Sequence, residues 1–145
     1  GYFADLFSPQ LPEGKIIALD PESSLTTWME ERKKRDSLDN VSIHKITEND
    51  PELGQLSDEI DLLFVGYTYF HFGDPVTYFR DKVYPYVQDK TVVAIADMAP
   101  VQGQPRHTVS AQQVIIEMAE AGFQIDAEPT TIYDQYLLIF KKSSQ

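Results

Sequence analysis

The sequence predicts a three-layer α/β domain with a mostly parallel sheet between two layers of helices. Short apolar runs of strand length alternate along the chain with segments that carry helix signals. The clearest run, residues 62–65, is unbroken and too short for an ordinary helix, which is typical of a strand that helices cover on both faces. Residues 15–20 and 90–97 are further runs of this buried kind. Helices that connect such strands produce a parallel sheet.

The first part of the chain is predicted to hold a helix, a strand, a second helix, a second strand and an irregular loop with a weak helical turn. These elements are expected at residues 1–8, 15–20, 21–37, 41–45 and 47–58. Asp20 followed by Pro21 is typical of a helix N-terminus, with the aspartate as N-cap and the proline at the first helical position. This helix is expected to fade near Ser37.

The second part is predicted to hold a strand, a helix, a strand, a helix and two late strands, at residues 60–65, 74–84, 90–97, 110–121, 123–127 and 132–140. Asp74 and Pro75 repeat the cap-then-proline start, and Ser110 with Gln113 forms a capping-box signature. Gly122 is expected just past the end of this last helix. The helix is expected to turn four residues inward, namely Val114, Ile115, Met118 and Ala119. The two late strands resemble a hairpin, which would add one antiparallel strand to the sheet.

Length and composition limit the possible classes of protein. At 145 residues, we expect residues 1–145 to form a single domain with one substantial core. The formal net charge of −11 repels phosphate backbones, so no nucleic acid partner is expected. The mixed charged cluster at residues 30–35 is either a local basic spot or a solvated helix face, and we favour the second. The absence of cysteine excludes disulfides and a cysteine nucleophile.

No membrane, targeting or metal signal is visible. No apolar run approaches the roughly 20 residues that span a bilayer. The first residues show no signal-peptide pattern, so a cytoplasmic location is the default expectation. Three histidines (His44, His71 and His107) lack the spacing of a metal site, so no metal is expected, and His44 is interpreted as structural. A homodimer is left open.

The residues that follow the run at 62–65 are the first candidates for a ligand site. In open α/β sheets, ligands bind in the crevice outside the carboxyl ends of the strands. Five residues stand at that position: Tyr67, Thr68, Tyr69, Phe70 and His71. The sequence therefore places aromatic and hydroxyl side chains where function is expected.

Three segments together resemble a known family. They are residues 12–21 (PEGKIIALDP), residues 68–72 (TYFHF), and residues 107–114 (HTVSAQQV) with 121–123 (AGF) after them. Their order and spacing resemble the class I S-adenosylmethionine-dependent methyltransferases, in particular the small-molecule branch that includes the ubiquinone and arsenite methyltransferases. The resemblance covers nearly the whole chain, although each motif alone is weak. It implies a Rossmann-like fold, S-adenosylmethionine as cofactor and methyl transfer to a small-molecule acceptor.

The start of the chain resembles the end of that family's glycine-rich turn. Gly1 looks like the last glycine of the turn, so the resemblance implies that Gly1 and Tyr2 contact the cofactor, where the missing Cβ permits a close approach. In the family, the strand that carries the rest of the motif lies between the strands that match residues 15–20 and 60–65. We therefore expect the sequence to be a fragment without this first strand. The competing interpretation is that the two neighbouring strands pair directly.

The resemblance implies a cofactor role for the end of the strand at residues 15–20. Asp20 matches the acidic residue that accepts hydrogen bonds from both ribose hydroxyls, a task that suits a carboxylate because it offers two acceptor oxygens. Pro21 follows it and is expected to contact the cofactor as well. The alternative is that Asp20 is only a helix N-cap.

The next loop matches the adenine side of the cofactor site. Ile46 is expected to pack on the adenine, or alternatively to fill the core. The family has an acidic residue where this chain has Thr47 or Asn49, so the expected contact at Thr47 departs from the pattern. Two acidic neighbours would substitute after a shift of register, Glu48 and Asp50.

The acceptor side is expected at the end of the strand predicted at residues 60–65. Gly66 and Tyr67 are expected to contact the cofactor, with Tyr67 also a candidate catalytic donor, although related enzymes often carry an acidic or amide residue there. His71 is the candidate general base, because imidazole changes its charge near neutral pH, or alternatively a structural histidine that caps or packs in the next turn. Tyr69 is interpreted as a wall of the substrate pocket. Substrate contacts are also expected from the later loop, at Arg106 and His107.

Three functions remain open. The first is S-adenosylmethionine-dependent methyl transfer to a small molecule. The second is a methyltransferase-like module that has lost catalysis and serves as a binding or assembly partner, which the departures at Thr47 and Tyr67 favour. The third is a nucleotide-binding domain of the dehydrogenase kind, against which the terminal hairpin argues.

Overall fold

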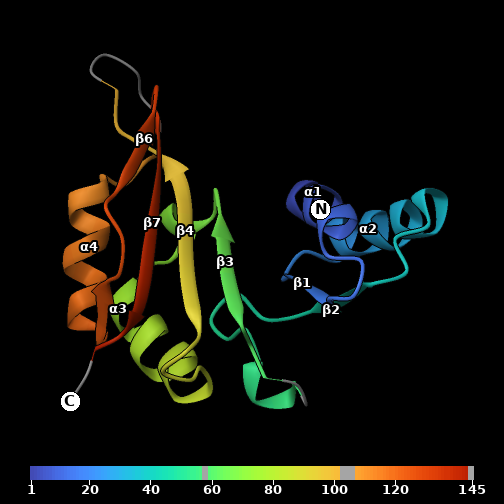
Figure 1. Cartoon of the computed structure of the whole chain (residues 1–145), viewed down its shortest axis with the longest axis horizontal. Helices are drawn as coiled ribbons and strands as arrows, with labels where there is room; N and C mark the ends of the chain where they lie inside the picture. Colours follow the sequence, from blue (N-terminus) through green and yellow to red (C-terminus); the bar gives the residue numbers. More distant parts are fainter. Residues whose placement is uncertain (57–58, 102–106, 144–145) are drawn as a thin grey trace. The chain divides into compact units, whose positions relative to one another are not determined.

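The structure is a computed structural model of the whole chain, and it describes residues 1–56, 59–101 and 107–143. The chain divides into two compact units, Gly1–Glu52 and Leu53–Gln145. We describe each unit by itself and call them unit 1 and unit 2 (Figure 1). That residues 1–145 form a single domain stays a prediction.

Unit 1 contains two helices and one parallel pair of strands, namely α1 (Tyr2–Phe7), β1 (Ile16–Asp20), α2 (Ser23–Asp36) and β2 (Val41–Lys45), with the 3₁₀ turn η1 (Ser8–Gln10) after α1. The strands pair from Ile16 with Val41 to Asp20 with Lys45. Because they are parallel, their carboxyl ends lie side by side. The two predicted strands and both predicted helices of this region are confirmed.

The start of α2 differs from the prediction. Asp20 is not its N-cap, because β1 stays extended and paired through Asp20 and the helix begins only at Ser23. Glu22 is the N-cap, and its side chain accepts a hydrogen bond from the backbone N–H of Ser24. The predicted end is confirmed, since Ser37 closes the helix in the left-handed conformation with φ 53°.

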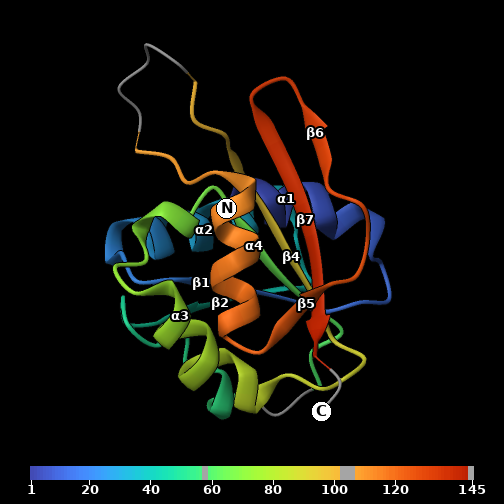
Figure 2. The ribbon, with the colours of Figure 1, turned by 90° about the vertical axis from the view of Figure 1, so that its left-hand side faces the viewer.

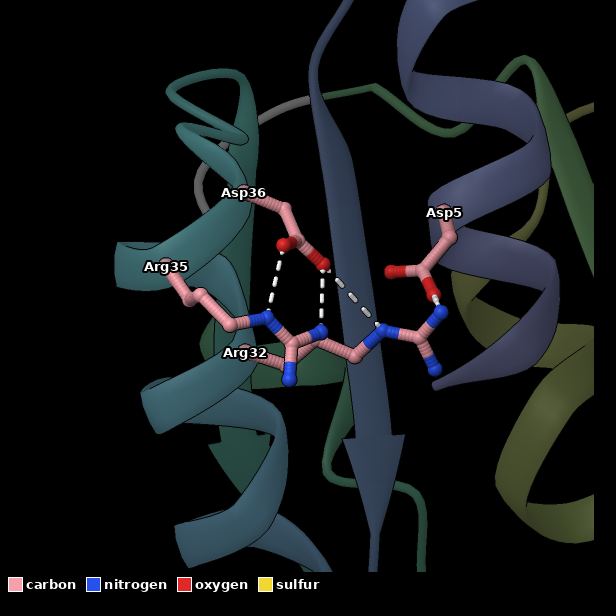
Figure 3. Close-up of polar contacts among 4 residues, drawn as sticks. All are labelled: Asp5, Arg32, Arg35 and Asp36. Atoms are coloured by element: carbon pink, nitrogen blue, oxygen red, sulfur yellow. Dashed lines mark hydrogen bonds and ion pairs between the residues drawn. The ribbon is translucent and has the colours of Figure 1, made fainter.

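The charged cluster of α2 is a network of ion pairs. Arg32 pairs with Asp5 of α1 and with Asp36 one turn along α2, and Arg35 donates two hydrogen bonds of 2.7 Å to the same carboxylate (Figure 3). The Arg32 guanidinium also lies 5.0 Å from the centre of the Trp28 ring. Both arginines of the cluster are therefore paired with nearby carboxylates, as expected for a solvated helix face.

The described residues of unit 2 form five strands, namely β3 (Leu62–Gly66), β4 (Val92–Met98), β5 (Phe123–Ile125), β6 (Thr130–Ile132) and β7 (Gln135–Lys142). The order across the sheet is β3-β4-β7-β5, and β6 also pairs with β7. β3 and β4 are parallel, whereas β7 runs antiparallel to β4, β5 and β6. The α/β class and the late antiparallel strand are thus confirmed, and the second late run is divided into the β6–β7 hairpin.

β1 and β3 are less buried than predicted. Every residue of β1 is half-buried, and Leu62 of β3 is exposed, whereas β4 is largely buried. Within its own unit, each of these strands has one pairing partner among the described residues, β2 for β1 and β4 for β3. A direct pairing of β1 with β3, the competing interpretation of the sequence, would join the two units and stays a prediction.

The helical segments of unit 2 cover one face of its sheet (Figure 2). They are η2 (Leu53–Gln55), η3 (Tyr69–His71), α3 (Pro75–Tyr78), a π-helical turn η4 (Phe79–Val83), η5 (Tyr84–Tyr86) and α4 (Ala111–Glu120). Asp74 caps α3 as predicted, and the Ser110 hydroxyl caps α4 by accepting from the Gln113 N–H at 3.2 Å. Ala119 was predicted to face inward but is exposed, so the buried stripe of α4 is narrower than expected.

An aromatic cluster forms the core beneath these helices. Phe79 lies at its centre, with no exposed surface, and its ring is 5.8 Å from Tyr69, 5.5 Å from Phe72 and 6.4 Å from Phe123. Edge-to-face and stacked pairs of this kind add to the stabilisation from burial. The cluster connects η3, η4 and β5, so it fixes the segment that follows β3.

Replacing Gly122 with alanine is expected to destabilise unit 2. Gly122 has φ 94°, and an added Cβ would lie 2.9 Å from Cε2 of Tyr84. The left-handed backbone alone costs an L-residue about 1–2 kcal/mol. Urea denaturation is therefore expected to show that the free energy of unfolding falls by at least this amount. Gly73→Ala is the matched control, because its added Cβ meets nothing within 4 Å. Equal stability of both variants would contradict this account.

Stability is expected to fall in acid because four carboxylates have lowered pKa values. A hydrogen bond from Arg35 lowers the pKa of Asp36, and one from Lys90 lowers the pKa of Glu59. The backbone N–H of Thr77 lowers the pKa of Asp74 in the same way, and Arg80 lowers the pKa of Asp81. A lowered pKa in the folded chain means that the stabilisation is complete above the ordinary value of about 4 and is lost as the pH falls through the folded value. Urea midpoints measured between about pH 6 and pH 2 should therefore decrease mainly below about pH 4. Midpoints that stay constant over this range would contradict the expectation.

Candidate functional site

In unit 2, four elements meet around the carboxyl ends of β3 and β4 (Figure 1). The backbone N–H of Tyr67 donates to the carbonyl of Ala96 at 2.8 Å, which extends the pairing of β3 and β4 by one residue. The beginning of β7 and the first turns of α4 add side chains to the same region. The predicted residues Gly66, Tyr67, Tyr69 and His71 all lie on this short stretch.

Tyr67 has an unusual backbone conformation. Its φ of 52° lies in the left-handed region, which costs a bulky residue about 1–3 kcal/mol and is found most often at functional sites. The Tyr67 hydroxyl donates to Oε1 of Gln135 at 2.8 Å, and the side chain is 39% exposed. The side chain is thus oriented from β7 while part of its surface remains accessible.

Tyr69 is buried rather than exposed to a pocket. Its side chain is 1% exposed, and its hydroxyl donates to Oε2 of Glu117 at 2.8 Å. Burial, reinforced by this carboxylate, raises the pKa of the Tyr69 hydroxyl well above its usual range. Burial and the carboxylates of Asp97 and Glu117 likewise raise the pKa of Tyr136. Both hydroxyls therefore stay protonated and act as hydrogen-bond donors, and the predicted contact of Tyr69 with substrate stays a prediction.

The two histidines that are candidates for the acceptor side, His71 and His107, are both exposed. His71 lies in η3 with its ring centre 4.0 Å from that of Phe70, and His107 lies in the loop before α4. An exposed imidazole at the carboxyl end of β3 is accessible to a ligand, which the general-base role requires. Arg106 lies outside the described residues. The roles of all three stay predictions.

In unit 1, the predicted cofactor residues gather at the carboxyl ends of β1 and β2. The backbone N–H of Ile46 donates to the carbonyl of Asp20 at 3.1 Å, so the two loops run side by side. Oδ1 of Asp20 accepts from the Glu22 N–H at 2.8 Å, and no described residue engages Oδ2. Asp20 is half-buried, and Pro21 and Thr47 are exposed. A carboxylate with one open oxygen beside an exposed loop fits the recognition of ligand hydroxyls.

Gly1 and Tyr2 lie at the start of α1. An added Cβ on Gly1 would be 3.0 Å from Cγ of Met29 and 3.1 Å from Cζ3 of Trp28, so packing against α2 is itself a reason for glycine here. Tyr2 is 62% exposed and has its ring against Phe3. Their predicted contact with a cofactor stays a prediction.

The loop after β2 forms a tight turn without an acidic side chain at Thr47. Thr47 bridges to Asp50, whose carboxylate accepts from the Glu52 N–H at 2.8 Å. Glu48 is exposed within this turn. Asp50 is therefore used locally, which leaves Glu48 as the acidic side chain that stands open to solvent on this side.

Sequence reasoning missed three residues of the unit 2 cluster: Asp97, Glu117 and Gln135. Asp97 follows a buried run, so the rule that ligand sites lie at the carboxyl ends of strands would have selected it. Glu117 and Gln135 have no such signal, because only the tertiary structure brings α4 and β7 to this place. In the described ranges, no three His, Asp or Glu residues form a metal-binding group, and no helix is both long and apolar enough to cross a membrane.

Comparison with known proteins identifies the fold. A methyltransferase dependent on S-adenosylmethionine from Aquifex aeolicus superposes with a TM-score of 0.78 over 97% of this chain and 78% of its own, at 16% identity. The chain has the class I methyltransferase fold. Two further structures share it: LepI in complex with S-adenosylmethionine (TM-score 0.73, 13% identity, 99% of this chain) and the mitomycin 7-O-methyltransferase MmcR (0.69, 10%, 89%). No family profile and no curated protein sequence matches the chain.

This chain spans only 40% of the length of LepI and 42% of MmcR. A methyltransferase fold at such low identity establishes architecture rather than reaction. The carboxyl-end clusters of unit 1 and unit 2 are the parts of this fold at which ligands are expected.

Proposed function

We propose that this protein binds S-adenosylmethionine and transfers its methyl group to a small-molecule acceptor. The observation that carries the proposal is Asp20, a carboxylate with an open Oδ2 at the carboxyl end of β1, in a chain with the methyltransferase fold. The resemblance read from the sequence assigns the ribose contact to this same residue. The resemblance and the open oxygen of Asp20 thus support the same proposal.

On the cofactor side, the carboxylate of Asp20 would accept hydrogen bonds from the two ribose hydroxyls. Ile46 and Thr47 would border the adenine, with Glu48 the nearest exposed acid. Pro21 would border the ribose. The first residues of α1, Gly1 and Tyr2, would face the amino-acid end of the cofactor, as the resemblance implies.

On the acceptor side, holding the acceptor atom in line with the methyl group supplies most of the acceleration of methyl transfer. When bound, S-adenosylmethionine supplies an electrophilic methyl group on a sulfonium. Gly66 would border the methyl group, and the Tyr67 hydroxyl would orient polar groups of the acceptor. His71 would accept the proton from the attacking heteroatom. Tyr69, whose ring is buried against Phe79, would hold the backbone of residues 66–71 in place. Arg106 and His107 would contact the acceptor.

The proposal is tested by calorimetric titration of S-adenosylhomocysteine into the full-length protein, with NAD as the comparison ligand. Micromolar binding of S-adenosylhomocysteine without binding of NAD is the expected result, and it would justify a screen for the methyl acceptor. A folded protein that binds neither ligand would contradict the proposal and favour a methyltransferase-like interaction module. Binding of NAD alone would indicate a nucleotide-binding domain of the dehydrogenase kind.

A further inference from the structure

Asp97 is a buried carboxylate for which the proposed function gives no role. It is the penultimate residue of β4 and is 2% exposed. Among the described residues, no basic side chain forms an ion pair with it. A carboxylate in such a place is costly unless hydrogen bonds compensate for the loss of water.

Both oxygens of Asp97 are used by backbone donors. Oδ2 accepts from the N–H of Tyr69 at 3.0 Å, and Oδ1 accepts from the N–H of Met98 at 2.7 Å. Two donors that approach from different segments require two acceptors on one short side chain. Aspartate meets this requirement, whereas asparagine offers one oxygen and would turn its NH₂ group toward the second N–H.

The hydrogen bond between Asp97 and Tyr69 helps to fix the strained backbone at Tyr67, two residues earlier. Tyr67 holds φ 52°, and the surrounding structure must enforce this conformation. Pairing with Ala96 fixes the stretch on one side of Tyr67, and the contact of Tyr69 with Asp97 fixes it on the other. The aromatic core holds the ring of Tyr69, so its backbone and its side chain are both anchored.

We propose that Asp97 is a positioning residue of the candidate site, whose carboxylate fixes the backbone at Tyr69 and so holds Tyr67 and His71 in their binding conformation. This inference rests on the proposed function, because it concerns the stretch that would face the ligand. It assigns to β4 a share in a site for which the sequence analysis named no residue of that strand.

Asp97→Asn tests the inference, with Thr91→Val as the matched control. Thr91 is 1% exposed at the opposite end of β4, where its hydroxyl accepts from the Gln88 N–H and donates to the Ile60 carbonyl. Each substitution removes at least one buried hydrogen bond next to the same strand. Only Asp97→Asn removes one from the candidate site.

The first readout is amide hydrogen exchange at Tyr69, which needs no ligand. Asp97→Asn is expected to speed this exchange about tenfold or more relative to Thr91→Val, because the local protection is lost. The second readout is the affinity for S-adenosylhomocysteine, expected to fall about tenfold in Asp97→Asn and to change less than about twofold in Thr91→Val.

Two results would overturn the inference while leaving the proposed function intact. One is equal exchange at Tyr69 in the two variants, and the other is unchanged affinity in Asp97→Asn despite faster exchange. A wild-type protein that does not bind S-adenosylhomocysteine would overturn the proposed function and this inference with it. The exchange result would then still show whether Asp97 fixes the backbone.

Discussion

Phe79→Ala is expected to lower the free energy of unfolding by about 3–5 kcal/mol, the usual cost of deleting a buried phenylalanine ring. Phe79 is fully buried, and rings from η3, the following turn and β5 surround it. The cavity would lie in the middle of an interlocked aromatic cluster, so the neighbours have little freedom to fill it. Urea denaturation followed by circular dichroism measures the loss.

The matched control is Tyr133→Ala. Tyr133 is also aromatic, but it is 96% exposed at the tip of the β6–β7 hairpin, with φ 56°. Its removal is expected to change the free energy of unfolding by no more than about 0.5 kcal/mol. If Phe79→Ala cost no more than Tyr133→Ala, the aromatic cluster would not be the core of unit 2.

Asp20→Ala is expected to weaken the binding of S-adenosylhomocysteine by about 1–3 kcal/mol, because it leaves two ribose hydroxyls without their acceptor. This corresponds to a loss of roughly 5- to 150-fold in affinity. Asp20→Asn keeps one acceptor oxygen, so its effect should be smaller. Calorimetry on both variants measures the difference.

Asp39→Ala is the control for Asp20→Ala. It removes the same charge from an exposed turn between α2 and β2, where the side chain has no predicted role. The affinity of Asp39→Ala for S-adenosylhomocysteine should equal that of the wild type. Equal losses in the two variants would show that net charge, rather than a ribose contact at Asp20, governs binding.

Much of the fold was predictable because local signals and tertiary structure agree. β2 begins and ends where its apolar pattern predicts, Asp74 and Ser110 cap their helices, and Gly122 adopts the positive φ expected after α4. Each of these features depends on one or two neighbouring residues. Propensity and capping chemistry are sufficient to find such features.

Other features depend on partners far along the chain. Asp20 followed by Pro21 has the pattern of an N-cap, but pairing of Asp20 with Lys45 keeps the backbone extended and delays the helix. Within unit 2, β3 has one pairing partner and its Leu62 is exposed, which no local pattern records. Long-range pairing overrides local propensity at these points.

The candidate site also combines features that local sequence predicts with features that depend on distant residues. The sequence placed Tyr67 and His71 after the strand predicted at residues 60–65, and the structure places them at the carboxyl end of β3. The partners that fix this stretch come from β4, α4 and β7, more than 25 residues away, as the contacts of Asp97, Glu117 and Gln135 show. Such partners are found only when the chain is folded.

The most direct test of the proposed function is to map S-adenosylhomocysteine onto the protein by the chemical shifts of its backbone amides. We predict shifts at Asp20, Ile46 and Thr47 in unit 1 and at Gly66 and Tyr67 in unit 2, with none at Asp89, an exposed residue of the turn before β4 at the opposite end of that strand. A spectrum of a folded protein that does not change on saturation with the ligand, or shifts confined to other residues, would contradict the proposed function.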